Sequence, residues 1–177
     1  MNILLIHQYY LEDDDHGGSR WNEITKQWVD EGHQVTVIAG MMHYTSSEKR
    51  TEYKGKWFVY KKQGAVEVER CHVSESYNAN FIGRLWAYFS FVFSSSWAGL
   101  FKVKGKFDVI IVTSPPLFVG ISGYIISLFK RTPYVFEIRD LWPESAIDTG
   151  VVTNKFIIKL AYVLEKFIYK KVCLPIL

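Results

Sequence analysis

The sequence predicts a doubly wound α/β fold, in which helices cover both faces of a mostly parallel β-sheet. Short β-branched apolar runs alternate along the chain with segments of helical periodicity, the order typical of this fold class. The first apolar run is nearly continuous, as expected of a strand buried on both faces. With 177 residues, 49% of them hydrophobic, the chain is large and apolar enough for one domain with its own core.

The first βαβ unit accounts for residues 2–39. A strand is expected at 2–9, a helix at 19–31 and a second strand at 34–39. Gly32 suits the position just after the helix, where a left-handed backbone ends many helices. A helix that joins two neighbouring strands in this way makes them parallel, with a right-handed crossover.

The rest of the chain continues the pattern after an irregular polar stretch at 40–56. Residues 57–73 alternate around Gln63-Gly64, which predicts an added β-hairpin. Further helices are expected at 81–103, 117–130, 141–147 and 155–171, and further strands at 108–113, 134–138 and from 172. A strand that begins so near the last residue indicates that the natural protein continues.

Composition excludes several other classes of protein. Cys71 and Cys173 lie far apart, so neither a disulfide framework nor a zinc site is expected, and no other metal site is predicted. The net charge of +3 is too small to indicate nucleic-acid binding. The N-terminal run has no lysine or arginine before it and ends in polar residues, unlike a signal peptide, and we expect a cytosolic location.

The stretch DDDHGGSRWNEI, residues 13–24, is the first candidate site. Gly17 and Gly18 lie between the first strand and the helix, where backbone amides and the positive end of the helix dipole attract an anion. The alternative is a tight turn that needs glycine only for its backbone conformation. A third glycine and a Gly-Lys-Ser/Thr sequence are both missing, which excludes a nicotinamide-dinucleotide fingerprint and a P-loop.

The sequence leaves more than one role open for the residues before the glycines. Asp13, Asp14 and Asp15 would repel a phosphate, so we expect them to face solvent, or to contact sugar hydroxyls or a bound cation. His16 either donates a hydrogen bond to a phosphate or fills the turn.

A second candidate site is YVFEIRDLWPES, residues 134–145, at the carboxyl end of a predicted strand, where ligands of open α/β sheets gather. Alternation along the strand places Glu137 and Arg139 on one side, either as an internal ion pair or facing a polar ligand. Asp140 and Glu144 flank Trp142-Pro143. An aromatic ring beside carboxylates suits a sugar, whose apolar face stacks while its hydroxyls donate to the acids.

Thr113-Ser114-Pro115-Pro116 ends another strand at the same edge. Its hydroxyl groups are expected either to line the ligand crevice or to belong to a strand-to-helix turn in which proline opens the next helix. Ser114 is the residue of this segment that we predict near the ligand.

Two of these segments resemble a known family. GGSRWNEITKQWVDEGHQVTVIAG, with Gly-Gly before the helix and EGHQVTV entering the second strand, is similar to the N-terminal domain of retaining GT-B glycosyltransferases of the family-four type. FEIRDLWPES resembles the bacterial subgroup that makes O-antigen, capsule and colanic-acid polysaccharides, including fucosamine-type transferases. The resemblance runs from the first strand to the helix at 155 and implies a Rossmann-like domain, one half of a GT-B fold.

The resemblance implies an enzyme that transfers a hexosyl group from a UDP- or GDP-linked sugar to a polyprenyl-diphosphate-linked acceptor, with retention of configuration and without a metal or other cofactor. Residues 1–177 correspond to the N-terminal, acceptor-side domain. The C-terminal nucleotide-sugar domain is absent, so we expect a fragment without transferase activity of its own. The alternatives are a stand-alone acceptor-binding subunit of a split glycosyltransferase and a GT-B-like nucleotide-sugar epimerase.

By the same resemblance, Gly17 and Gly18, with His16 and Ser19, form the loop that meets the donor diphosphate. Asp140 lies near the acceptor hydroxyl as a hypothetical base, although in such enzymes the leaving phosphate itself is thought to take the proton. The acceptor-side residues implied with it are Ser114, Glu137, Arg139, Trp142 and Glu144.

The segment 84–104 shows two apolar stripes, where a helix on a sheet needs only one. The second stripe is aromatic with basic residues at its ends, as in an interfacial membrane helix, and the serines of this segment argue against a transmembrane span. We predict a peripheral position on the anionic inner leaflet of the plasma membrane, with contacts from Trp86, Phe93, Trp97 and Phe101. The alternative is a core helix covered by the missing domain or a dimer partner. Lysines of 155–171 add a face that either contacts anionic lipid or is only solvated.

Overall fold

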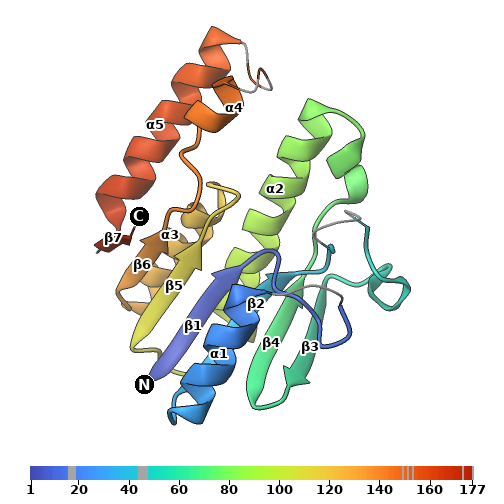
Figure 1. Cartoon of the computed structure of the whole chain (residues 1–177), viewed down its shortest axis with the longest axis vertical. Coiled ribbons are helices and arrows are strands. Elements are labelled where there is room, and N and C mark those ends of the chain that lie inside the picture. The colour runs from blue at the N-terminus through green and yellow to red at the C-terminus, as the bar shows by residue number, and fades with distance from the viewer. Residues whose placement is uncertain are drawn as a thin grey trace.

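The computed structural model describes residues 1–15, 19–43, 48–148, 150, 152, 154–172 and 174–176 (Figure 1). These residues form a seven-stranded sheet in the order β3-β4-β2-β1-β5-β6-β7. The strands are β1 (Asn2–His7), β2 (Gln34–Gly40), β3 (Phe58–Gln63), β4 (Val66–Cys71), β5 (Val109–Thr113), β6 (Tyr134–Glu137) and β7 (Leu174–Ile176). The β3–β4 hairpin is antiparallel, and the other strand pairs in the described residues are parallel.

The helices follow the predicted periodicity. They are α1 (Arg20–Asp30), α2 (Phe81–Trp97), α3 (Val119–Lys130), α4 (Glu144–Asp148) and α5 (Lys155–Lys171), with 3-10 turns η1 (Thr51–Tyr53) and η2 (Glu75–Asn78). The helix expected at 81–103 ends as an α-helix at Trp97 and continues as one π-helical turn, η3 (Ala98–Lys102). The prediction of a doubly wound α/β fold with an added hairpin is confirmed.

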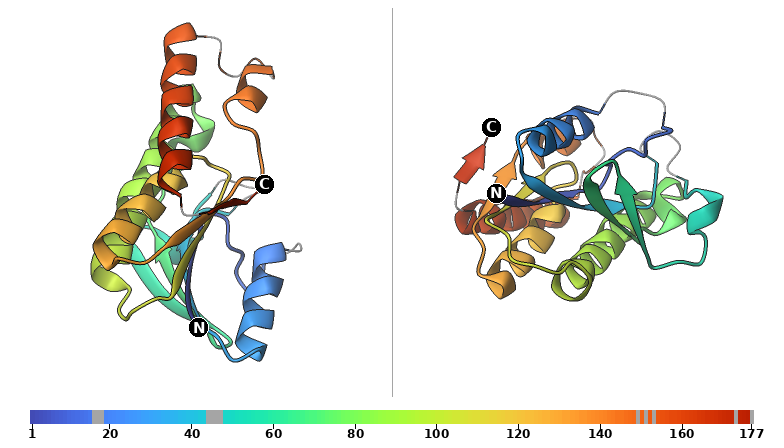
Figure 2. Two further views of the ribbon diagram at one scale, coloured as in Figure 1. Left: turned by 90° about the vertical axis from the view of Figure 1, so that its left-hand side faces the viewer. Right: turned by 90° about the horizontal axis from the view of Figure 1, so that it is seen from below.

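Helices cover both faces of the sheet: α1 lies on one face, and α2, α3 and α5 lie on the other (Figure 2). The side chains of β1 alternate between the two cores. Leu4 and Ile6 pack in the core beneath α2 and α3, whereas Leu5 packs with Trp21 of α1. The first strand is therefore buried on both faces, as its continuous apolar sequence predicted.

Small residues let α2 and the π-helical turn η3 approach α3 closely. The hydroxyls of Ser95 and Ser122 are 2.8 Å apart between α2 and α3. A Cβ atom at Gly99 would lie only 2.3 Å from Cδ1 of Ile126, so this close approach requires glycine. Within the part of the chain that the structure describes, none of the helices has the length and apolar composition needed to cross a membrane.

The sheet extends in both directions from β1. β2 pairs in parallel with one side of β1, and β5 pairs in parallel with the other. The carboxyl ends of β1, β5 and β6 therefore lie along one edge, where Thr113 is opposite Glu137. Because ligands of doubly wound sheets bind outside the carboxyl ends where the strand order reverses, this edge is the candidate site.

Candidate functional site

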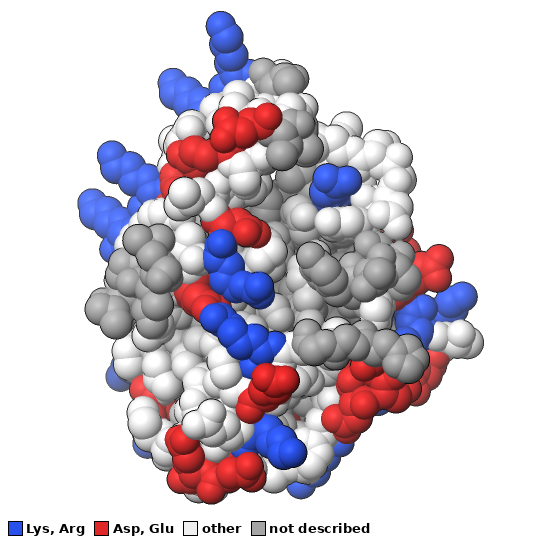
Figure 3. Space-filling view, in the orientation of Figure 1, with Lys and Arg blue, Asp and Glu red and all other residues white. Residues whose placement is uncertain are grey.

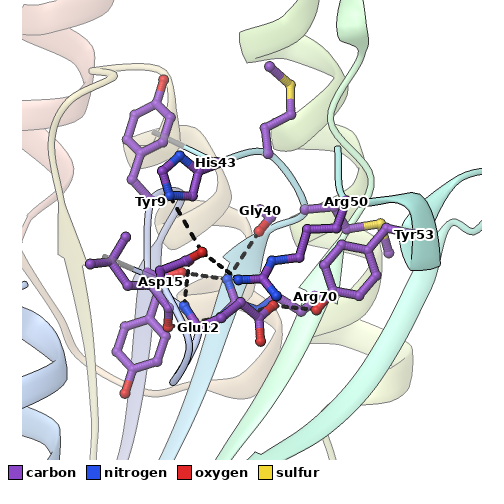
Figure 4. Close-up of a pocket in the computed structure, with 12 residues that line it drawn as sticks. Tyr9, Glu12, Asp15, Gly40, His43, Arg50, Tyr53 and Arg70 are labelled. Atoms are coloured by element: carbon purple, nitrogen blue, oxygen red, sulfur yellow. Dashed lines mark hydrogen bonds and ion pairs between the residues drawn. The ribbon is translucent and has the colours of Figure 1, made fainter. Parts of the chain in front are cut away.

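One buried arginine holds the segment that leaves β1. Arg70 of β4 is only 2% exposed. Its Nη1 donates to the carbonyls of Tyr10, at 2.5 Å, and Gly40, at 3.3 Å (Figure 4). Its Nη2 donates to the carbonyl of Leu11 at 3.1 Å, and its Nε lies 3.0 Å from Oε1 of Glu12 as an ion pair. Arg70 thus satisfies three backbone carbonyls and pairs with one carboxylate.

Glu12 is the acidic partner of Arg70 and is itself 8% exposed. The hydroxyl of Tyr53 donates to its carboxylate, and Nζ of Lys61 lies 3.4 Å from it. Burial and the hydrogen bond to Glu12 raise the pKa of Tyr53 to about 12. Several donors therefore surround a carboxylate that would be costly to bury alone.

The aspartates before the glycines are engaged by the protein itself. Arg50 donates to Oδ2 of Asp14 at 2.7 Å and to Oδ1 of Asp15 at 2.5 Å. Nε2 of Gln63 donates to Oδ1 of Asp13 at 3.1 Å. Burial alone would raise the pKa of Asp15, but hydrogen bonds from a backbone N–H and from Arg50 outweigh it and lower that pKa. The expectation that these aspartates face solvent is confirmed for Asp13 and Asp14, which are exposed although Gln63 and Arg50 contact them. It is wrong for Asp15, whose side chain is only 9% exposed and is bound by Arg50.

These residues enclose almost no free space. We call Glu12, Asp15, Arg50, Tyr53 and Arg70 the Arg70 cluster. The cavity that they help to line has a volume of about 10 Å³, roughly enough for one water molecule. The Arg70 cluster is therefore a support for the segment between β1 and α1, and a sugar or nucleotide does not fit inside it.

The predicted phosphate loop is only partly described. His16, Gly17 and Gly18 lie outside the described residues. Ser19 is the N-cap residue of α1, with an extended backbone and no capping hydrogen bond from its side chain. Contact of these four residues with a donor diphosphate stays a prediction.

Arg20 connects the start of α1 to the end of β6. Its Nη2 forms an ion pair with Oε1 of Glu137, and the hydroxyl of Thr113 donates to Oε2 of Glu137 at 2.7 Å. The structure pairs Glu137 with Arg20, and not with Arg139 as the ion-pair interpretation of the sequence supposed. On this face, basic and acidic side chains alternate in a band over α1 and the region above it (Figure 3).

Ser114 supports the turn after β6. It is 3% exposed, and its Oγ accepts a hydrogen bond from the backbone N–H of Arg139 at 3.0 Å. The same hydroxyl donates to the carbonyl of Glu137 at 3.3 Å. Ser114 thereby fixes the backbone that presents the exposed side chain of Arg139. The predicted contact of Ser114 with a ligand stays untested.

The next residues form an exposed rim. Asp140 is exposed, and Trp142 is half-buried, packed edge-on against Phe118 with ring centroids 5.5 Å apart. Glu144 is the exposed first residue of α4, and together with burial it raises the pKa of Tyr162 on α5. Among the described residues, no group of three or more His, Cys, Asp or Glu side chains is arranged to hold a metal ion.

Sequence reasoning missed two polar residues at the end of β1. His7 and Gln8 are 5% and 1% exposed. Nδ1 of His7 and both amide atoms of Gln8 have no hydrogen-bond partner among the described residues. Burial first, and then the charges of nearby arginines, foremost Arg139, lower the pKa of His7 to about 3, so its ring is neutral. A histidine and a glutamine at the end of an apolar strand were the signal available in the sequence.

Comparison with known proteins identifies the family of this chain. Residues 17–172 match the family described as a glycosyl transferase 4-like domain. The chain belongs to this family. A glycosyl transferase 4-like domain is the N-terminal half of a GT-B glycosyltransferase, so the resemblance to a GT-B N-terminal domain is confirmed and sugar transfer is supported as the activity. A comparison with proteins of curated function found no match.

The contribution of Arg70 to the stability of the folded domain can be measured. We expect Arg70→Met to lower the free energy of unfolding of this glycosyl transferase 4-like domain by about 3–5 kcal/mol, because it leaves Glu12 buried without its cation. The control is Lys62→Met, at an exposed position on β3, which should change the free energy of unfolding by less than about 0.5 kcal/mol. Urea unfolding measures both, and equal effects would contradict the role of Arg70.

The buried His7 predicts a pH dependence of stability. The pKa of His7 is depressed to about 3 in the folded state, against the ordinary value of 6.5 for a histidine side chain. The unfolded chain therefore binds more protons between these values, so stability is complete above the unfolded pKa and falls with decreasing pH. We expect a loss of about 2 kcal/mol between about pH 7 and pH 5 from this residue. His7→Phe should remove that part of the loss in urea unfolding. An identical pH dependence in both proteins would show that His7 titrates normally.

Proposed function

We propose that this domain is the N-terminal, acceptor-side half of a retaining hexosyltransferase. The enzyme would transfer a sugar from a UDP- or GDP-linked donor to a polyprenyl-diphosphate-linked acceptor, in the biosynthesis of O-antigen, capsule or a related cell-surface polysaccharide. The observation that supports this most is the contact between Arg20 and Glu137, because it brings the segment after the glycines and the segment before Asp140 to one edge of the sheet.

This edge offers chemical groups that sugar transfer requires. The start of α1 is positive, which suits a diphosphate. Asp140 presents an exposed carboxylate that can accept a hydrogen bond from an acceptor hydroxyl, and the half-buried ring of Trp142 can stack on a sugar. In this proposal Asp140 orients the acceptor hydroxyl. The acceptor oxygen bonds to the anomeric carbon as the bond to the leaving diphosphate breaks, and the leaving phosphate takes the hydroxyl proton.

The nucleotide is assigned in this proposal to a C-terminal domain that residues 1–177 do not include. The chain alone would then hold an acceptor without transferring sugar to it. Two other functions use the same fold. A stand-alone acceptor-binding subunit would dock a separate donor-binding chain, and an epimerase would act on a nucleotide sugar without any acceptor.

Transfer assays separate these functions. We expect residues 1–177 alone to give no transfer, and a protein that joins them to a nucleotide-sugar domain to glycosylate a lipid-diphosphate acceptor. Asp140→Asn should lower kcat/KM by roughly 100-fold or more, because the acceptor hydroxyl loses its orienting carboxylate. Asp30→Asn, at the exposed end of α1, is the control and should keep the full rate. Turnover by residues 1–177 alone, or of nucleotide sugar without acceptor, would contradict the proposal.

Membrane contact through α2 is part of the proposal, since a polyprenyl acceptor is presented at a lipid surface. The four aromatic residues expected to face lipid are all exposed: Trp86 by 57%, Phe93 by 66%, Trp97 by 55% and Phe101 by 62%. Basic residues flank them at Arg84, Lys102, Lys104 and Lys106. Exposed aromatic rings with flanking cations favour the interface of an anionic bilayer, here the cytoplasmic face of the plasma membrane.

Vesicle flotation tests this contact. The variant in which Trp86, Phe93 and Trp97 are changed to Ser should bind anionic phosphatidylglycerol vesicles roughly tenfold less, because it loses the apolar area that enters the bilayer. Trp57→Ser removes an exposed tryptophan beside β3 and is the matched control, with binding unchanged. Equal flotation of the triple variant and the wild type would show that this face does not bind lipid.

A further inference from the structure

Open space lies at the amino ends of the strands, away from the candidate site. A cavity of about 380 Å³ is lined by the starts of β1 and β2 and by the segment 104–107. A second cavity, of about 210 Å³, is lined by β2, β3, β4 and the end of η3, and Thr36, Glu67 and Lys104 line both. The start of β1 is at the far end of the molecule from α4 (Figure 1). The larger cavity is in the size range of small-molecule sites, about 300–1,000 Å³.

A buried carboxylate lines the smaller cavity without a partner. Glu69 of β4 is only 7% exposed, and within the described part of the chain its carboxylate forms no hydrogen bond or ion pair. Lys102 acts on Glu69 electrostatically, but Nζ of Lys102 lies over the ring of Phe58, 5.5 Å from the ring centroid. Burial raises the pKa of Glu69, and the charge of Lys102 offsets only part of this effect. Buried polar groups are nearly always paired, so Glu69 indicates a ligand that donates hydrogen bonds into the cavity.

The hairpin places an aromatic ring beside this carboxylate. In β4, Val66 and Val68 pack in the core beneath α1. Side chains alternate along a strand, so Glu67 and Glu69 point to the opposite face. Tyr60 of β3 is directly opposite Glu69 in the antiparallel pair and is 54% exposed. Directly opposite residues share a face of the sheet, so the Tyr60 ring and the Glu69 carboxylate border the same cavity.

The charges around the cavity favour a neutral ligand. Lys102 and Lys104 are exposed at its border, together with the carboxylates of Glu67 and Glu69. The lysines would repel a cation, and the glutamates would repel an anion. Hydroxyl groups can donate to the carboxylates and accept from the ammonium groups at the same time. The exposed ring of Tyr60 can pack against the apolar face of a sugar.

We propose that Glu69, Tyr60 and Lys104 form a binding site for a neutral saccharide at the amino ends of the strands. Glu69 accepts hydrogen bonds from sugar hydroxyls, Tyr60 packs against the sugar ring, and Lys104 donates to a further oxygen. This site goes beyond the proposed function and does not depend on it. It lies at the opposite end of the sheet from Asp140 and shares no residue with the edge assigned to sugar transfer.

Amide NMR spectra of residues 1–177, titrated with maltose, cellobiose, lactose and N,N′-diacetylchitobiose, test the site. At least one of these neutral disaccharides should shift the amide signals of residues 67–69 and 102–104. Glu69→Leu should weaken that binding roughly tenfold or more, because it removes the buried acceptor. Tyr60→Ser should weaken it severalfold, since it removes the ring that packs against the sugar. Glu23→Leu, at an exposed position of α1 on the other face of the sheet, is the control and should bind as the wild type does.

Urea unfolding separates a loss of binding from a loss of fold. Glu69→Leu should be at least as stable as the wild type, because an apolar side chain replaces an unpaired buried carboxylate. A clear loss of stability would show that this carboxylate has a structural partner and would contradict the site.

The titration itself has outcomes that overturn the inference. These are no shift at residues 67–69 and 102–104 with any of the four sugars, equal binding by Glu69→Leu and the wild type, and shifts confined to residues around Asp140. Tighter binding of spermidine or of pyrophosphate than of any sugar at the same amides would show that the cavity takes a charged ligand, and would also overturn it. A disaccharide bound at residues 67–69, with no sugar transfer by the joined enzyme, would contradict the proposed function alone.

Discussion

The arrangement of the candidate site depends on one buried arginine. β2 and β5 flank β1 in the sheet. The segment that follows β1 leaves the sheet, so its backbone groups need hydrogen-bond partners other than a neighbouring strand. Arg70 supplies partners for this segment by donating to the carbonyls of Tyr10 and Leu11 and by pairing with Glu12, and it also donates to the carbonyl of Gly40 at the end of β2. The added hairpin therefore has a specific task, because β4 positions Arg70 beneath this segment.

A fixed segment after β1 places the start of α1 beside the end of β6. Arg20 and Glu137 are far apart in sequence, yet they meet because β1, β5 and β6 are parallel and in register. Thr113 holds the second oxygen of Glu137 and so connects β5 to the same contact. One edge of the sheet thus combines a positive helix start, a basic residue at 139 and an exposed carboxylate at 140, which together suit a sugar diphosphate and a hydroxyl acceptor.

The spacing of apolar residues predicted the fold well, because it directly reflects which side chains are buried. The continuous apolar run of β1 and the alternation around Gln63-Gly64 correspond to a doubly covered strand and to an edge hairpin. The ionic contacts were not predictable, since Arg50 reaches Asp14 and Asp15 from a distant, irregular segment. His7 was overlooked because an apolar strand suggested only core packing. The sequence predicted that the segments around the glycines and around Asp140 lie at the same edge of the sheet, and the tertiary structure decided which charges meet there.

The central claim is that the start of α1 and the end of β6 share one site. A double-mutant cycle on the free energy of unfolding with Arg20→Gln and Glu137→Gln measures this most directly. The contact predicts a favourable coupling of about 0.5–1 kcal/mol, modest because Arg20 is half exposed and solvent screens the pair. A cycle of Arg20→Gln with Glu144→Gln should give no coupling, because these two side chains do not contact each other in the described part of the structure. A coupling of zero between Arg20 and Glu137 would contradict the account.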